Sequence, residues 1–242
     1  MEYDTATPTA RDESADRLRA GTDILLVAAI SAAAFAAESA AAGFLPWGAE
    51  ARGVVAVLAG AIAAVLMTRH RGGTLADLGF REPRRWSTVP LWVVGILAAY
   101  IVAQGPVPLL VGQFLHVPEP DLSRYDALRG NLFGVLAMAL VLPLTAAIPE
   151  EVLYRGFLIE RLSRLLGPLP GSALIAVLLQ ALVFGSVHFQ WGVGGVVVTT
   201  VMGIVWGIAF LLCGRNLWIV IIAHSAAHLA LLAQLYFSPA PA

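Results

Sequence analysis

Long apolar blocks, separated by short polar links, occupy most of this 242-residue chain. An α-helix needs about 20 apolar residues to cross a lipid bilayer. The apolar blocks are Ile24–Phe44, Val54–Met67, Val89–Gly112, Leu132–Pro149 and beyond, Ala173–Phe189, Val193–Cys213 and Leu217–Tyr236. The pattern therefore predicts an all-α, polytopic membrane helix bundle with about seven transmembrane helices.

Three features of these blocks and links make the predicted helices differ from one another. Val54–Met67 is the shortest block, and Val89–Gly112 contains Pro106 and Pro108, which predict a kink or a break because proline cannot donate a backbone hydrogen bond. The link Leu165–Gly171 holds two prolines and two glycines, a composition typical of a tight turn. We therefore expect the helices on either side of this link to form an antiparallel hairpin.

The polar N-terminal segment differs from the rest of the chain. Residues 1–21 are rich in Asp, Glu and Thr, which predicts a disordered tail. Residues 22–238 then form a single membrane helical domain. No internal repeat divides this domain.

Composition supports the membrane assignment and excludes other classes. The chain is 59% hydrophobic and 13% charged, whereas a soluble domain carries about 25% charged residues. A net charge of −1 gives no electrostatic support for nucleic acid binding. A membrane bundle has membrane lipid as a partner. The single cysteine, Cys213, cannot form an internal disulfide.

The distribution of arginine predicts the orientation of the chain. All 15 basic residues are arginines, and a cytoplasmic N-terminus would leave only Arg52, Arg124 and Arg129 on the outer side. The positive-inside rule therefore favours a cytoplasmic N-terminus, most simply in the cell (plasma) membrane. In the basic link Thr68–Trp86, apolar residues alternate with arginines, so we expect this link to lie on the cytoplasmic leaflet.

Ionisable residues interrupt the apolar blocks at a few positions. Carboxylates and imidazoles are costly in or near lipid and are seldom kept there without a use. They are Glu150, Glu151, His188, His224 and His228. A pair of carboxylates with embedded imidazoles can activate water, so an enzyme is the leading hypothesis.

The two adjacent glutamates are expected to differ in role. Glu151 and Arg155 are four residues apart and share a helix face, so they can form an ion pair that only holds the structure together. Glu150 faces about 100° away with no local cation, which makes it the candidate base. Pro149 removes a helical hydrogen bond just before the pair and favours a bend that lines a wet cavity.

The histidines can reach the glutamates if the predicted hairpin forms. With its turn centred at Pro168, Glu150 and His188 would differ in depth by only about 3 Å. His224 and His228 are spaced i and i+4 and share one helix face, where they can bind one metal or line one pocket.

These motifs resemble those of the CAAX-protease and bacteriocin-processing family of intramembrane endopeptidases. The likeness covers about residues 132–232. It consists of E-E-x-x-x-R (Glu150, Glu151, Arg155), F-x-x-x-H (Phe184, His188) and H-x-x-x-H (His224, His228). The family commonly has Asn or Asp where this chain has His228.

The resemblance implies an all-helical fold with its active site inside the membrane. It implies that Glu150 and His188 activate the attacking water, while His224, with His228, stabilises the oxyanion. If Zn²⁺ is bound, the resemblance implies Glu150, His188 and His224 as its ligands, although a metal-free glutamate mechanism fits the family as well. The substrate would be a membrane-associated peptide, such as a prenylated CAAX-type or a bacteriocin-like protein.

Two alternatives from other classes stay open at this point. The chain could be a non-catalytic membrane scaffold or immunity protein of the same fold. It could also be a small transporter that uses the Glu/His cluster, together with Glu38, as a proton relay. An enzyme requires Glu150, His188 and His224 around one water site, whereas a relay requires polar groups along a path that reaches both faces.

Overall fold

The computed structural model describes residues 10–44, 53–105 and 118–238, and within these ranges every regular element is helical. The η elements are 3₁₀-helices, except η5 and η6, which are π-helices. In chain order the elements are α1 (Ala10–Ala41), η1 (Ala42–Phe44), α2 (Val54–His70), η2 (Leu75–Leu78), η3 (Trp86–Thr88), α3 (Val89–Gln104), η4 (Ser123–Leu128), α5 (Leu132–Leu142), η5 (Pro143–Ala147), α6 (Ile148–Glu150), η6 (Glu151–Leu158), α7 (Ile159–Leu166), α8 (Ser172–Ser186), η7 (Phe189–Trp191), α9 (Gly192–Leu212) and α10 (Leu217–Phe237).

The predicted all-α membrane bundle is confirmed. Among the described residues, five helical segments are long and apolar enough to cross a membrane: Asp12–Ala41, Trp86–Gln104, Leu132–Leu166, Phe189–Leu212 and Leu217–Phe237. The two other predicted spans fall on the shorter apolar helices α2 and α8, of 17 and 15 residues.

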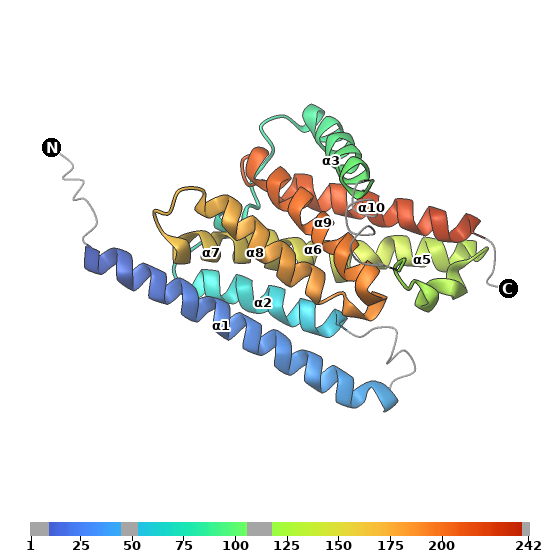
Figure 1. The fold of residues 1–242 in the computed structure, drawn as a ribbon, viewed down its shortest axis with the longest axis horizontal. Helices are drawn as coiled ribbons and strands as arrows, with labels where there is room; N and C mark the ends of the chain where they lie inside the picture. The colour runs from blue at the N-terminus through green and yellow to red at the C-terminus, as the bar shows by residue number, and fades with distance from the viewer. Residues whose placement is uncertain (1–9, 45–52, 106–117, 239–242) are drawn as a thin grey trace.

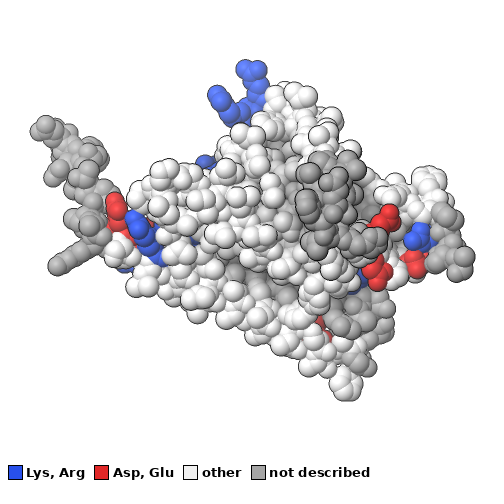
Figure 2. All heavy atoms as spheres, in the orientation of Figure 1, with Lys and Arg blue, Asp and Glu red and all other residues white. Residues whose placement is uncertain are grey.

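The surface of the bundle is that of a membrane protein. Large apolar side chains point outward, with Leu91 75% exposed and Val102 73% exposed on α3. On the face in Figure 2, charged atoms lie toward the edges of the molecule and the broad middle carries almost none. Such a surface is stable against lipid tails and would be a liability in water. The chain is therefore an integral membrane protein.

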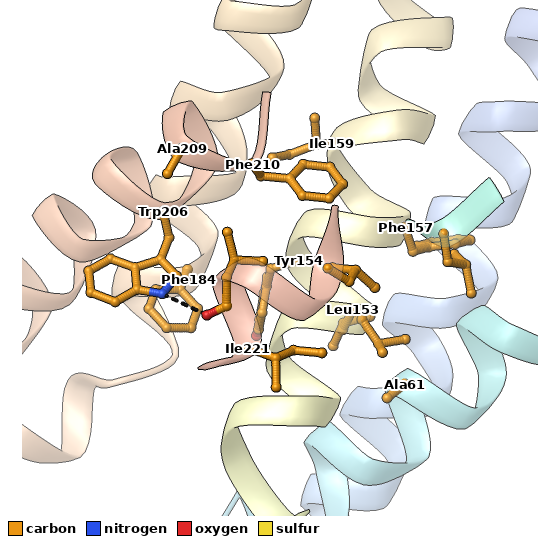
Figure 3. Close-up of a cluster of buried hydrophobic side chains, with 14 of the residues drawn as sticks. Ala61, Leu153, Tyr154, Phe157, Ile159, Phe184, Trp206, Ala209, Phe210 and Ile221 are labelled. Carbon is orange, nitrogen blue, oxygen red and sulfur yellow. Dashed lines mark hydrogen bonds between the residues drawn. The ribbon is translucent and has the colours of Figure 1, made fainter. Parts of the chain in front are cut away.

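The π-helix η6 lies at the centre of the bundle. It contacts α2, α8, α9 and α10, while α1 covers α2 and α7 on the outside (Figure 1). Seven consecutive residues of η6, from Glu151 to Phe157, are buried, so its whole circumference is covered by other helices. Phe157 of η6 belongs to the same buried core as Trp206 and Phe184, and Trp206 Nε1 donates to the carbonyl of Val220 at 3.2 Å (Figure 3).

The helical segment Leu132–Leu166 is irregular where the sequence predicts a bend. Pro149 lies in α6, which has only three residues and is flanked by the π-helices η5 and η6. Pro149 has no N–H to donate to the fourth residue before it, and its ring crowds that carbonyl, so the regular α-helical bonding is disturbed. Widened π turns of this kind are common at functional sites.

The predicted disordered tail is wrong for residues 10–21, which form the first turns of α1; residues 1–9 lie outside the described residues. The reason is a tertiary contact that composition does not reveal. Asp23 is only 2% exposed and accepts hydrogen bonds from Arg71, which directly follows α2, and from Arg161 of α7. This contact fastens the beginning of α1 to the bundle.

Other ionisable residues and prolines singled out in the sequence lie away from the glutamate–histidine cluster or outside the described residues. Glu38 accepts from the backbone N–H of Gly53 at 2.8 Å, and so caps the start of α2. His70 ends α2 and is exposed, as expected for a residue of the basic link. His116 and the two prolines of the Val89–Gly112 block lie outside the described residues, and α3 ends at Gln104.

Close packing of α8 against α9 depends on two glycines one turn apart. A Cβ added at Gly203 would lie 2.8 Å from Cα of Ala181, and one added at Gly207 would lie 2.7 Å from Cγ1 of Val177. This G-x-x-x-G arrangement lets two membrane helices approach closely. The packing fixes α8, whose C-terminal end carries His188.

We expect Gly203→Val to destabilise the bundle by about 1–3 kcal/mol, because the added side chain must displace the α8 backbone. Unfolding of the purified protein in detergent micelles would measure this. Gly95→Val is the matched control, since Gly95 has open space around its Cβ position on α3. An equal loss in both variants would show that helix propensity, and not interhelical contact, dominates the effect.

Candidate active site

Two carboxylates and one imidazole meet where η6 contacts α10. Nδ1 of His224 lies 2.7 Å from Oε1 of Glu151, and Nε2 of the same ring lies 3.7 Å from Oε2 of Glu150. Glu151 and His224 are almost completely buried, while the Glu150 side chain is 14% exposed. The adjacent glutamates thus reach opposite nitrogens of one histidine, and Glu150 is the more accessible of the two.

Arg155 completes this cluster from within η6. Its Nη1 lies 3.1 Å from Oε1 of Glu151, and both side chains are fully buried. The guanidinium also lies over the ring of Phe184, at 4.5 Å from its centroid. With Glu151 ionised opposite Arg155, that carboxylate can only accept, so Nδ1 of His224 donates and its Nε2 keeps a lone pair.

His188 lies just beyond α8, held by backbone and aromatic contacts. Its Nδ1 donates to the carbonyl of Phe184 at 2.7 Å, because a carbonyl can only accept. The ring packs between Phe184 and Trp191, with centroid distances of 4.8 and 5.0 Å. Its Nε2 therefore also keeps a lone pair. Phe184 contacts both His188 and Arg155, and so links α8 to the cluster.

His228 lies one turn after His224 on α10. The two rings pack with their centroids 4.5 Å apart. Nδ1 of His228 is buried and, within the described residues, has no hydrogen-bond partner. Oε2 of Glu151 and the guanidinium nitrogens of Arg155 are likewise buried without hydrogen bonds in this part of the chain. Buried polar atoms are rarely left so, and water or a substrate would satisfy them.

The structure thus brings Glu150, Glu151, Arg155, His224 and His228 into direct contact. His188 joins them through the Phe184 ring, and it interacts electrostatically with Arg155, His224 and His228. The predicted turn is present between α7, which ends at Leu166, and α8, which begins at Ser172.

Some side chains at the site were not expected from the sequence. In the sequence Phe184 is only the first position of the F-x-x-x-H motif, yet in the structure it contacts both Arg155 and His188. Trp191 packs on His188, and its Nε1 is buried without a hydrogen bond to any described residue. Tyr125 of η4 interacts electrostatically with Glu150, although it comes 25 positions earlier in the chain. Only the F-x-x-x-H spacing, which places a carbonyl one turn before His188, carried a signal for any of these contacts.

The expected metal ligands do not form a recognisable metal site. Among the residues that the structure describes, no three His, Cys, Asp or Glu side chains are arranged to hold a metal ion. Glu150 and His224 are in contact, but His188 is reached only through Phe184 and is oriented by its bond to a backbone carbonyl. The residues present therefore do not fit the Zn²⁺ ligand set of Glu150, His188 and His224, and no catalytic step is derived through a metal.

Part of the chain is similar to a known protein family. Residues 132–230 match the family model described as type II CAAX prenyl endopeptidase Rce1-like. This part of the chain, about two fifths of its length, is similar to the CAAX-protease family. This region includes every predicted site residue, from Glu150 to His228. No curated protein and no solved structure matches the chain.

We expect Arg155→Met to lower the stability of the protein by about 3–5 kcal/mol, because it leaves the Glu151 carboxylate buried without a cation. Adding Glu151→Gln should restore part of this loss, since no buried charge then remains. Unfolding in detergent micelles would measure both variants.

Arg164→Met is the control for this experiment. Arg164 pairs with Glu160 at 2.9 Å, but its side chain is 45% exposed. Such an ion pair contributes about 0–1 kcal/mol. A similar small loss for Arg155→Met would contradict the view that Glu151 requires its partner.

Proposed function

We propose that this protein hydrolyses a peptide bond in a membrane-associated substrate, with Glu150 as the general base. The observation that carries the proposal is the arrangement of His224. Its Nδ1 is engaged by Glu151, while its Nε2 faces Glu150 across 3.7 Å. Two acceptors at this separation can both lie within hydrogen-bonding distance of one water molecule.

In this mechanism His224 orients the water and the glutamate activates it. Nε2 of His224 accepts a hydrogen bond from one O–H of the water, because this ring donates through Nδ1, and the second O–H is directed to Glu150. Nε2 of His188 is likewise an acceptor, since its Nδ1 donates to the Phe184 carbonyl. Glu150 takes a proton from the water as its oxygen forms a bond to the scissile carbonyl carbon. When the C–N bond breaks, Glu150 returns this proton to the leaving amine.

The negative charge that develops on the carbonyl oxygen needs a donor. Because His188 and His224 accept through Nε2, His228 is the better candidate for this role. Its Nδ1 is buried beside His224 and has no hydrogen-bond partner among the described residues. A preorganised donor of this kind stabilises the oxyanion of an acyl-transfer reaction. His228 would then do what the family's Asn does at this position.

An apolar groove beside the site supports a lipid-bearing substrate. It has a volume of about 290 Å³ and lies between α2 and the segment from η5 to η6. Leu58 and Ile62 line one side, and Leu144, Pro149 and Val152 line the other. Pro149 directly precedes Glu150, so an apolar chain in this groove would place an attached peptide near the base. A prenylated CAAX-type peptide combines these two parts.

The proton-relay alternative has less support. Such a relay would need Glu38 on a path from the site to the second face of the membrane. Glu38 instead accepts from the backbone N–H groups of Gly53 and Val55 at the start of α2. Its carboxylate therefore already has a structural use as a helix cap.

We expect Glu150→Gln to reduce proteolysis by about 10²–10⁴-fold while the protein remains folded, because the amide cannot accept the proton. Cleavage of a fluorogenic farnesylated CAAX peptide by the protein in lipid vesicles would measure this. Glu82→Gln, at an exposed loop glutamate, is the control and should keep full activity. Undiminished cleavage by Glu150→Gln would refute the assignment of the base.

We expect His228→Ala to lose about 10²–10³-fold in kcat, the usual cost of removing one oxyanion donor. His228→Asn should retain much more activity, because the amide can donate from the same helix position. The same peptide assay distinguishes the two variants. If Asn and Ala lower kcat equally, His228 acts in some other way than as a hydrogen-bond donor.

A further inference from the structure

A second polar cluster lies apart from the active site, where α1, α2 and α7 meet. It surrounds a cavity of about 110 Å³. The lining residues are Asp16, Arg19, Ala20, Asp23, Arg71, Arg161 and Arg164. Charged atoms gather at this end of the molecule, where α1 begins (Figure 2). None of these residues has a part in the proposed hydrolysis.

The cavity has more positive than negative charge, with four arginines against two aspartates. Asp23 is buried and orients two of the arginines, since it accepts from Nε and Nη2 of Arg71 and from Nε of Arg161. Each of these guanidiniums has further N–H groups that Asp23 does not use. Arg19 has no hydrogen bond or ion pair with any residue in the described part of the chain.

Such a set of guanidiniums matches a phosphate group. Arginine forks bind phosphate oxygens in a bidentate manner, and orientation by a buried carboxylate reduces the entropy lost on binding. The volume is large enough for several water molecules, and thus for one phosphate group. The Phe157 ring, 5.2 Å from Cζ of Arg161, further fixes that side chain.

We propose that this cavity binds a phosphate group, supplied by the headgroup of an anionic phospholipid. The cavity lies toward the N-terminal end of a helix that is long and apolar enough to cross a membrane, where a lipid headgroup can reach it. The positive-inside rule places this arginine-rich end at the cytoplasmic leaflet, where anionic lipids are common.

Thermal unfolding of the full chain in a neutral detergent would test this proposal without any need for proteolytic activity. Dioctanoyl phosphatidylglycerol should raise the unfolding midpoint in a saturable way, while dioctanoylglycerol, which lacks the phosphate, should not. Inorganic phosphate in the same assay identifies the source. If it saturates the site and the lipid does not, the phosphate site stands but its ligand comes from solution.

Variants of the lining arginines test the location of the site. Arg19→Gln should weaken phosphatidylglycerol binding by about tenfold, the effect of losing one charge-assisted hydrogen bond. Because Arg19 is exposed and pairs with no described residue, this variant should fold normally. Arg164→Gln should also weaken binding.

Arg85→Gln is the matched control, because Arg85 is exposed in the link before α3 and does not line the cavity. It should leave binding unchanged. Absence of saturable binding by both lipid and phosphate would overturn the proposal. So would an equal loss in Arg19→Gln and Arg85→Gln, since it would show diffuse attraction to surface charge.

Discussion

The buried ion pair between Glu151 and Arg155 is the constraint on which the arrangement of the bundle depends. Both side chains are fully inaccessible, and removal of such charges from water costs several kcal/mol for each ion unless every partner is in place. The partners come from other helices, because His224 of α10 contacts Glu151 and the Phe184 ring of α8 contacts Arg155. Sliding of α10 would remove the His224 hydrogen bond from Glu151, and sliding of α8 would remove the Phe184 ring from Arg155, so the pair also fixes where the histidines lie.

The π-helical backbone next to Pro149 shapes the catalytic arrangement. In a regular α-helix, neighbouring side chains point about 100° apart, which predicts different surroundings for Glu150 and Glu151. Here they do differ in burial, yet both meet one ring, because His224 presents its two nitrogens to the two carboxylates. One glutamate fixes the tautomer of His224, and the other is available for the role of base that we propose. The structural and the chemical roles are thus divided between adjacent residues.

Much of the fold could be predicted from the sequence, because long apolar blocks and the Leu165–Gly171 turn are local signals. The i, i+4 spacing of Glu151 and Arg155 likewise predicted their ion pair. What could not be predicted depends on contacts between distant residues. The beginning of α1 has the composition of a disordered tail, but Asp23 is bound by arginines 48 and 138 positions later. The contacts of Phe184 with Arg155 and His188 also depend on how helices pack, which no spacing reveals.

The two polar clusters lie on one continuous helical segment, and this connects them physically. Leu132–Leu166 carries Glu150 at the proposed active site and Arg161 at the proposed phosphate site, 11 residues further on. A helix rises about 1.5 Å per residue, so Glu150 and Arg161 are no more than about 16 Å apart along the helix axis. This distance is about half the thickness of the hydrocarbon core. A lipid phosphate held at Arg161 would therefore fix the depth of Glu150 in the bilayer. Because the apolar groove at Pro149 lies next to the proposed base, that depth would also decide which bond of the proposed lipid-anchored peptide reaches the water.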